Sequence, residues 1–117
     1  MKHVLQLAYC FLYYKLCDIF VLPSFKEPYG LVINEVLNCA KPVITTTEVG
    51  CAKDLIFHGI NGFIYEPNNI KDLSKYLKYF IKDRNLSKIM GKKSLDKINN
   101  WSFVQSVEGI FKALKSL

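Results

Sequence analysis

Two glutamates, Glu27 and Glu35, have the types and spacing best suited to chemistry in this sequence. Between them, Pro28 and Gly30 favour a tight turn. A predicted helix then begins, and the first backbone N–H groups of a helix have no partner inside it. Those groups and the positive end of the helix dipole favour an anion such as a phosphate or a diphosphate. The sequence therefore predicts an anion-binding turn over residues 30–32, flanked by two carboxylates.

The second glutamate is expected one turn into the helix, on a polar stripe with Asn34 and Asn38 that points away from the apolar face. A carboxylate there can accept hydrogen bonds from sugar hydroxyls, as acidic residues do toward ribose in dinucleotide-binding folds. The spacing therefore suits a nucleotide sugar. The alternative is a pair of solvated side chains, because the dipole favours acids near any helix start. The positions of the charges alone favour solvated side chains. Only the combination of the two carboxylates with the predicted turn favours a binding site.

The elements around this turn predict a parallel sheet. Residues 18–23, 43–46 and 63–65 read as three short buried strands, bounded by Pro23, Lys41-Pro42 and Pro67. Helical segments separate the strands, and that alternation implies parallel pairing with right-handed crossovers. The expected fold is α/β, half of a doubly wound (Rossmann-like) sheet with about three strands and flanking helices. The anion site would lie at the carboxyl ends of the strands.

Helices are predicted for the rest of the chain. One contains the clearest amphipathic stripe, expected to be core: Ile70, Leu73, Tyr76, Leu77, Phe80 and Ile81. A second helix is expected from Leu86 to Ile98, with an interruption at Asn99-Asn100. A last helix is predicted to begin at Trp101-Ser102, with an inner stripe of Val104, Val107, Ile110, Phe111 and Leu114.

Length and composition favour a single domain: 117 residues, half of them hydrophobic, can bury one core. No stretch reaches the roughly 18 apolar residues of a membrane helix, so no membrane span is expected. Met1-Lys2-His3 and the apolar run that follows imitate a secretory signal. However, no small-residue cleavage site follows, and Tyr13 and Tyr14 crowd the end of the run. We favour a helix packed on the sheet.

The cysteines and the net charge do not predict a metal site, a disulfide scaffold or a nucleic-acid site. Cys10, Cys17, Cys39 and Cys51 form no CxxC pair, and the chain has only two histidines, so neither a metal site nor a disulfide scaffold is predicted. Reduced, partly buried thiols suit a cytoplasmic location. The formal charge of +6 could favour nucleic acid. The late lysines lack interleaved aromatic residues, so we favour a solvated helix face and no nucleic-acid partner.

Residues 18–24 and 27–35 resemble the donor-site motif of the retaining nucleotide-sugar glycosyltransferases of family 4, also called group 1. That motif is a strand ending in Leu-Pro-Ser, then Glu, Pro, an aromatic residue, Gly-Leu, and a second Glu after seven intervening residues. The loop at residues 49–55 is similar to a variant that the family also uses. The resemblance runs from about Tyr13 onward and covers the distal part of the carboxy-terminal domain of the two-domain GT-B fold.

The resemblance implies roles for particular residues. Glu27, the catalytic candidate, would lie against the hydroxyls of the transferred sugar, and Glu35 would accept from the nucleotide ribose. The implied donor-binding set is Glu27, Pro28, Tyr29, Gly30, Leu31, Val32 and Glu35. The complete enzyme would move a sugar from a nucleoside diphosphate to a hydroxyl acceptor with retention. No metal or other cofactor is expected, and the nucleotide sugar is a co-substrate.

The resemblance also implies what this chain would lack. Residues 1–117 would form one partial carboxy-terminal, donor-binding domain without the amino-terminal acceptor domain. The arginine and lysine that hold the leaving diphosphate in the family would also lie upstream. Loss of such a group typically raises the barrier by a few kcal/mol, so the activity expected of this chain alone is low.

Two other functions stay open. The chain could be a non-catalytic remnant or interaction module, which would pair with a missing amino-terminal domain or with itself through the exposed edge of the strand at residues 18–23. It could also be another phosphate-binding α/β protein, such as a dinucleotide enzyme. The sequence has neither GxGxxG nor a P-loop pattern, which argues against the latter.

Overall fold

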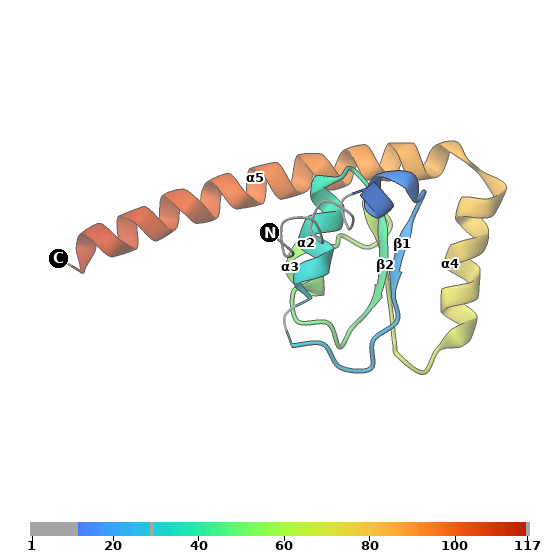
Figure 1. The fold of residues 1–117 in the computed structure, drawn as a ribbon. Coiled ribbons are helices and arrows are strands. Elements are labelled where there is room, and N and C mark those ends of the chain that lie inside the picture. Colours follow the sequence, from blue (N-terminus) through green and yellow to red (C-terminus); the bar gives the residue numbers. More distant parts are fainter. Residues whose placement is uncertain (1–11, 29, 117) are drawn as a thin grey trace.

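A computed structural model of the chain describes residues 12–28 and 30–116, with side chains for all of these except Leu31 and residues 101–110. Residues 12–16 are helical. The elements that follow are β1 (Phe20–Leu22), α2 (Leu31–Asn38), β2 (Val43–Thr46), α3 (Ala52–Leu55), β3 (Gly62–Tyr65), α4 (Ile70–Lys82) and α5 (Asn85–Lys115) (Figure 1).

The three strands form one parallel sheet in the order β1-β2-β3. Val21 pairs with Ile44 in the first ladder, and Ile44 pairs with Phe63 in the second. Helices connect the consecutive strands, as parallel pairing requires. The predicted Rossmann-like half-sheet is therefore confirmed, although β1 is shorter than the expected strand over residues 18–23.

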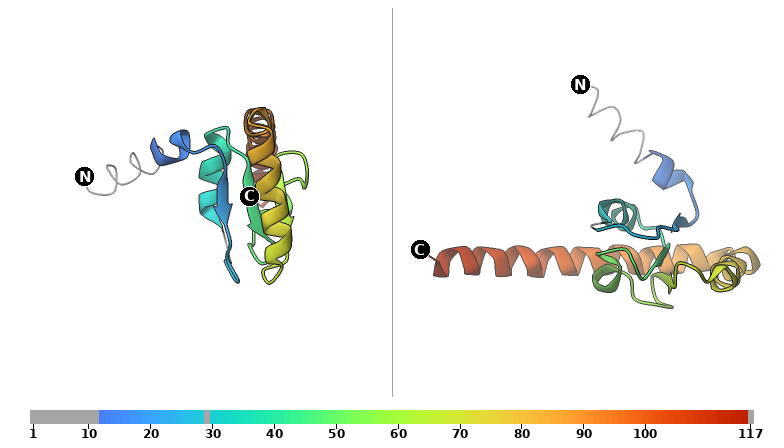
Figure 2. Two further views of the ribbon diagram at one scale, coloured as in Figure 1. Left: turned by 90° about the vertical axis from the view of Figure 1, so that its right-hand side faces the viewer. Right: turned by 90° about the horizontal axis from the view of Figure 1, so that it is seen from below.

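Helices cover both faces of the sheet, and alternate strand residues supply the two cores. The core on one face contains Val43 with Ile33 and Leu37 of α2, and the core on the other contains Ile44 with Tyr76 and Phe80 of α4. Figure 2 shows α2 on one side of the strands and α4 on the other. Because both faces are covered, the strands are apolar on both sides.

Helix α5 crosses the amino ends of the strands and packs into both cores. Met90 lies in the core beneath α4, whereas Ile98 lies in the core beneath α2. A Cβ at Gly91 would be 2.0 Å from the carbonyl oxygen of Ala40, so α5 touches backbone at the turn before β2. Ser94 Oγ donates to the Asn61 carbonyl before β3 at 3.3 Å. The crossing leaves the carboxyl ends of the strands uncovered by α5.

The predicted break at Asn99-Asn100 is wrong, because α5 is one helix from Asn85 to Lys115. Asparagine lowers helix propensity only modestly and, unlike proline, keeps its N–H and its helical φ. The last part of α5 projects beyond the sheet (Figure 1). Phe111 and Leu114, expected on an inner stripe, are 60% and 59% exposed. The other three residues of that stripe lie outside the described side chains.

The burial predicted for two residues of α4 is wrong. Ile70 and Ile81 were expected in the core, yet they are 73% and 76% exposed, because the buried side of α4 is centred on Tyr76 and Phe80.

The apolar run from Val4 to Tyr14 was expected to form a helix packed on the sheet, and most of that run lies outside the described residues. Of the residues that are described, Leu12, Tyr13 and Leu16 are 53%, 70% and 74% exposed, whereas Tyr14 packs against Phe20 of β1.

Within the described part of the chain, none of the helices is long and apolar enough to cross a membrane.

Candidate anion-binding site at the carboxyl end of the sheet

The connection from β1 to α2 turns at Gly30, which has φ +67° and ψ +39° and precedes the helix. This left-handed conformation strains any residue with a Cβ. Space is also short, because a Cβ here would lie 2.6 Å from Val49 Cγ1 and 2.9 Å from Cys51 Sγ. Position 30 therefore requires glycine both for its backbone conformation and for the lack of space around it. The sequence predicted the tight turn but not this lack of space.

Backbone hydrogen bonds tie this connection to the loop after β2. Glu27 N donates to the Glu48 carbonyl at 3.2 Å, and Gly50 N donates to the Glu27 carbonyl at 2.8 Å. Together they form an isolated parallel bridge between Glu27 and Val49. Cys51 Sγ lies 3.2 Å from the Gly30 carbonyl oxygen. The backbone at Glu27 is thus fixed by the loop at residues 48–51, most of which belongs to the segment that resembles a family variant.

Two threonines at the end of β2 anchor the chain leaving β1. Thr45 Oγ1 donates to the Leu22 carbonyl at 3.1 Å, and Thr46 Oγ1 donates to the Ser24 carbonyl at 2.6 Å. Both threonines are fully buried. The sequence interpretation used them only as β-branched strand formers. A hydroxyl at the end of a buried strand needs a hydrogen-bond partner, so these two threonines could have indicated a contact with a neighbouring segment of the chain.

The side chain of Glu27 is half-buried and turned toward the helix start. Its Oε1 accepts from Gly30 N at 3.4 Å, a long hydrogen bond. The carboxylate therefore lies at the mouth of the turn, as expected. Pro28 is exposed beside it, whereas Tyr29 lies outside the described residues.

Glu35 is less exposed than the two asparagines of the predicted polar stripe. Asn34 and Asn38 are exposed as expected, but Glu35 is half-buried and its Oε2 accepts a hydrogen bond from Tyr14 Oη at 3.1 Å. The Tyr14 ring packs edge-on against Phe20 of β1, with 5.8 Å between the ring centroids. Sequence reasoning missed Tyr14, since no local pattern links two residues 21 positions apart.

The start of α2 keeps free backbone donors. Among the described side chains none caps this helix, and its first turn contains no acidic residue, so the nearest carboxylate is that of Glu27, which accepts only from Gly30 N, through a long hydrogen bond. Val32, in that first turn, is half-buried. Backbone N–H groups at such a helix start attract anions. The arrangement can therefore accept a phosphate over residues 30–32, with one carboxylate at the mouth of the turn and the other one turn along the helix.

Burial raises the pKa values of the three described cysteines, of which Cys51 lies beside the Gly30 turn. Burial raises the pKa of Cys51, and hydrogen bonding to its backbone opposes that shift only in part. Burial is also the largest cause of the raised pKa values of Cys17 and Cys39. All three are free thiols. Among the described residues, no group of three or more His, Cys, Asp or Glu side chains is arranged to hold a metal ion.

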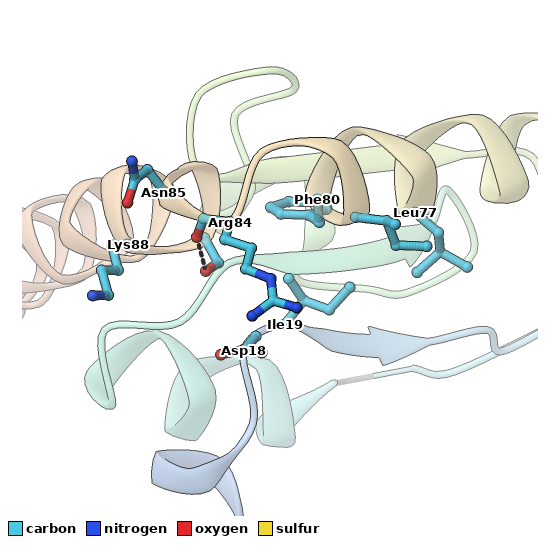
Figure 3. Close-up of a pocket in the computed structure, with 9 residues that line it drawn as sticks. Asp18, Ile19, Leu77, Phe80, Arg84, Asn85 and Lys88 are labelled. Carbon is cyan, nitrogen blue, oxygen red and sulfur yellow. Dashed lines mark hydrogen bonds between the residues drawn. The ribbon is translucent and has the colours of Figure 1, made fainter.

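A separate groove of about 580 Å³ lies at the other end of β1. Asp18 and Ile19 border it before β1, and Phe80, Arg84 and Lys88 border it from the end of α4 and the start of α5 (Figure 3). Glu27 follows β1 at its carboxyl end, so this groove is not part of the candidate anion-binding site.

The sequence matches the family described as "Glycosyl transferases group 1" over residues 10–97. An uncharacterized glycosyltransferase of Methanocaldococcus jannaschii is 33% identical over 101 residues, which are 86% of this chain and 28% of that protein. A capsular polysaccharide biosynthesis glycosyltransferase of Staphylococcus aureus is 28% identical over 85% of this chain and 28% of its own length. The chain thus spans a little over a quarter of these relatives.

Solved structures share the fold. An Anabaena protein, HepE, crystallised with UDP, has a TM-score of 0.75 and 28% identity over 89% of this chain and 29% of its own. The same protein with UDP-glucose has a TM-score of 0.73 and 27% identity over the same shares. A sucrose-phosphate synthase of Thermosynechococcus elongatus has a TM-score of 0.77 at 23% identity, covering 92% of this chain and 28% of its own, and indicates the fold alone.

Proposed function

The chain belongs to the glycosyl transferases of group 1, and from that premise we propose that the stretch from Glu27 to Glu35 binds the nucleoside diphosphate of an activated sugar. The observation that carries the proposal is the start of α2. A glycine in the left-handed conformation leads into an uncapped helix, between two half-buried carboxylates. The solved relative with bound UDP supports the choice of ligand.

In this proposal, the diphosphate lies over the amides of Gly30, Leu31 and Val32, where the helix dipole opposes its negative charge. Glu35 accepts hydrogen bonds from the ribose, a role that its position one turn into the helix suits. The hydrogen bond from Tyr14 fixes the rotamer of the Glu35 carboxylate and leaves its other oxygen to accept. Pro28 and Tyr29 complete the donor-binding stretch.

Glu27 is the proposed catalytic residue, placed against the hydroxyls of the transferred sugar. The reaction forms a bond from an acceptor hydroxyl oxygen to the anomeric carbon and breaks the bond from that carbon to the diphosphate. The nucleoside diphosphate leaves, and the hydroxyl proton is lost to base. We propose retention of configuration and assignment to family 4, both on the motif at residues 27–35. The acceptor would be held by a domain outside residues 1–117, and a cytoplasmic site of action suits the free thiols.

Calorimetric titration tests donor binding directly. We expect UDP and UDP-glucose to bind the full chain and Glu35→Gln to weaken binding about tenfold, the loss of a charge-assisted hydrogen bond. Asp96→Asn is the matched control, because it removes one exposed carboxylate on α5 and should leave the affinity unchanged. No binding at millimolar UDP, or equal affinity in Glu35→Gln and the parent chain, would overturn the proposal.

A second function, an interaction module, is favoured by one specific observation. β1 is an edge strand of the sheet, and no other strand among the described residues pairs with its outer side. An unpaired edge can add a strand from another molecule. The partner would be a second copy or the remaining part of such a domain. Light scattering after size exclusion distinguishes the two functions: a monomer at high concentration argues against self-association through β1.

A further inference from the structure

The outward side of α4 carries a line of lysines. They follow each other at intervals of four, three and four residues, which places them within about 60° of one another around the helix. All are exposed, and their positions on the helix lie opposite Tyr76 and Phe80, which are buried against the sheet, although Lys75 Nζ reaches to 5.3 Å from the centre of the Tyr76 ring. We call these residues the α4 lysine stripe: Lys71, Lys75, Lys78 and Lys82.

Few acids offset this charge. The only acidic residue in α4 is Asp72, whose carboxylate accepts a hydrogen bond from Asn69 Nδ2 at 2.9 Å and helps to form the helix start. Glu66 and Asp83 flank the helix ends and are exposed. Asp72 lies three residues before Lys75, so it faces only the first part of the stripe, and no acidic residue of α4 lies within four residues of Lys78 or Lys82.

Apolar side chains flank the same stripe. Ile70 and Ile81, at the two ends of α4, are 73% and 76% exposed, and Tyr79 on the other flank is 42% exposed. Together with the lysines, Ile70 and Tyr79 line a shallow hollow of about 480 Å³. Single exposed apolar residues are ordinary on protein surfaces. Large exposed apolar residues on both sides of a row of lysines are, however, typical of an amphipathic helix that lies in the interface of a charged membrane.

We propose that this face of α4 docks on an anionic lipid surface, with the lysines at the phosphate level and Ile70 and Ile81 in the interface. Clusters of four or more basic residues on a helix bind anionic lipid electrostatically. The isoleucines favour lipid over nucleic acid, because a phosphate backbone offers them no apolar environment.

The fold keeps this surface separate from the donor site. α4 lies on one side of the sheet, and α2, which begins the candidate site, lies on the other (Figure 2). A membrane under α4 therefore leaves the start of α2 accessible. Lipid docking and nucleotide binding are independent, and either can fail without the other.

Vesicle co-sedimentation tests the proposal with the full chain. Binding to phosphatidylcholine vesicles containing 30% phosphatidylglycerol is compared with binding to pure phosphatidylcholine, at about 0.1 M salt. Each lysine is expected to contribute about fivefold to the partition coefficient. Changing all four lysines of the α4 stripe to glutamine should therefore lower binding by two to three orders of magnitude. Salt of about 1 M should abolish it, because the Debye length falls to about 3 Å.

The matched control changes four exposed lysines elsewhere, and so lowers the net charge equally: Lys53→Gln, Lys88→Gln, Lys92→Gln and Lys93→Gln. This control should keep most of the binding. The double variant Ile70→Ser and Ile81→Ser should weaken vesicle binding more than Ile89→Ser does. Ile89 serves as the comparison because it is an isoleucine on α5 that is 51% exposed. Circular dichroism and UDP titration of each variant verify that the fold and the donor site are intact.

Three results would overturn the proposal. The first is equal binding of the parent chain to neutral and anionic vesicles. The second is an equal loss in the α4 variant and its control, which would make net charge the cause. The third comes from fluorescence anisotropy with a labelled 20-base-pair DNA: a loss of DNA binding specific to the α4 variant, with vesicle binding retained, would identify a nucleic-acid site. If the fourfold variant is misfolded, Lys75→Gln with Lys78→Gln provides the same comparison against Lys92→Gln with Lys93→Gln.

Discussion

Replacing Gly30 by alanine should destabilise the protein through two separable terms. The left-handed conformation, with φ +67°, costs a residue with a Cβ about 1–2 kcal/mol. The new Cβ would also meet Val49 Cγ1 at 2.6 Å and Cys51 Sγ at 2.9 Å. Val49 is 2% exposed and cannot move freely, so this overpacking costs about 1–3 kcal/mol more. We expect the free energy of unfolding to fall by about 3 kcal/mol in total.

A double-mutant cycle separates the two terms. Val49→Ala alone removes buried methyl groups and should cost about 1–3 kcal/mol. In a chain that already carries Val49→Ala, the Cβ introduced by Gly30→Ala no longer meets Cγ1 of residue 49. The loss of unfolding free energy caused by Gly30→Ala should then fall to the cost of the left-handed conformation plus that of the contact with Cys51. Urea unfolding of the four chains, followed by circular dichroism, measures the coupling, which we expect to be favourable by about 1 kcal/mol or more.

The same variant also tests the site. Because residue 30 supplies the first amide of the proposed anion site, Gly30→Ala should lower the affinity for UDP even where the chain remains folded. A cost below about 1 kcal/mol, or a coupling of zero with Val49→Ala, would refute the reasoning from steric contact. Unchanged UDP affinity in the folded variant would contradict the proposed position of the diphosphate.

Four further changes follow from contacts seen in the structure. Gly91→Ala should destabilise by about 2 kcal/mol in urea unfolding, because its Cβ would lie 2.0 Å from the Ala40 carbonyl oxygen and the clash outweighs the better helix propensity. Ala40→Gly should stabilise by about 0.5–1 kcal/mol in the same assay, since Ala40 has φ +58° just after α2. Tyr14→Phe should weaken UDP binding about fivefold by calorimetry, because it removes the hydrogen bond to Glu35. Finally, burial raises the pKa of the thiols of Cys17, Cys39 and Cys51, so the folded state holds their protons more tightly. The stability that the protonated thiols contribute is fully present below the ordinary thiol pKa and is lost as pH rises through the raised pKa values of the folded state. The free energy of unfolding should therefore be lower at pH 10 than at pH 8.

Each of these predictions has a matched comparison. Lys92→Ala changes an exposed neighbour of Gly91 on the same helix and should leave stability almost unchanged. Destabilisation by Ala40→Gly would show that packing of this methyl group outweighs its backbone strain. Tyr79→Phe removes a hydroxyl from an exposed tyrosine on α4 and should not affect UDP binding. An unfolding free energy independent of pH in this range would show that thiol burial contributes little.

Local patterns predicted most of the elements correctly. Three apolar, β-branched runs separated by helical segments were enough to predict a parallel half-sheet. The start of α4 also has a local cause: asparagine favours the N-cap position, and Asn69 Oδ1 accepts from Asp72 N at 3.1 Å. The prediction of a break at Asn99-Asn100 was wrong because asparagine makes a helix slightly weaker but does not prevent it. The burial predicted for Ile70 and Ile81 was wrong because hydrophobicity alone does not tell which side of a helix a neighbouring sheet covers.

For the candidate site, the sequence by itself determined the residues that form it: two carboxylates separated by seven residues, a glycine turn and a helix start. These are local features, set by steric limits on the backbone and by the groups that a helix leaves unpaired. The contacts that hold them in place come from distant parts of the chain. The loop at residues 48–51 bonds the backbone of Glu27, and Tyr14 orients Glu35. Only the tertiary structure decided these contacts, because residues about 20 positions apart meet only when the sheet and its helices pack together.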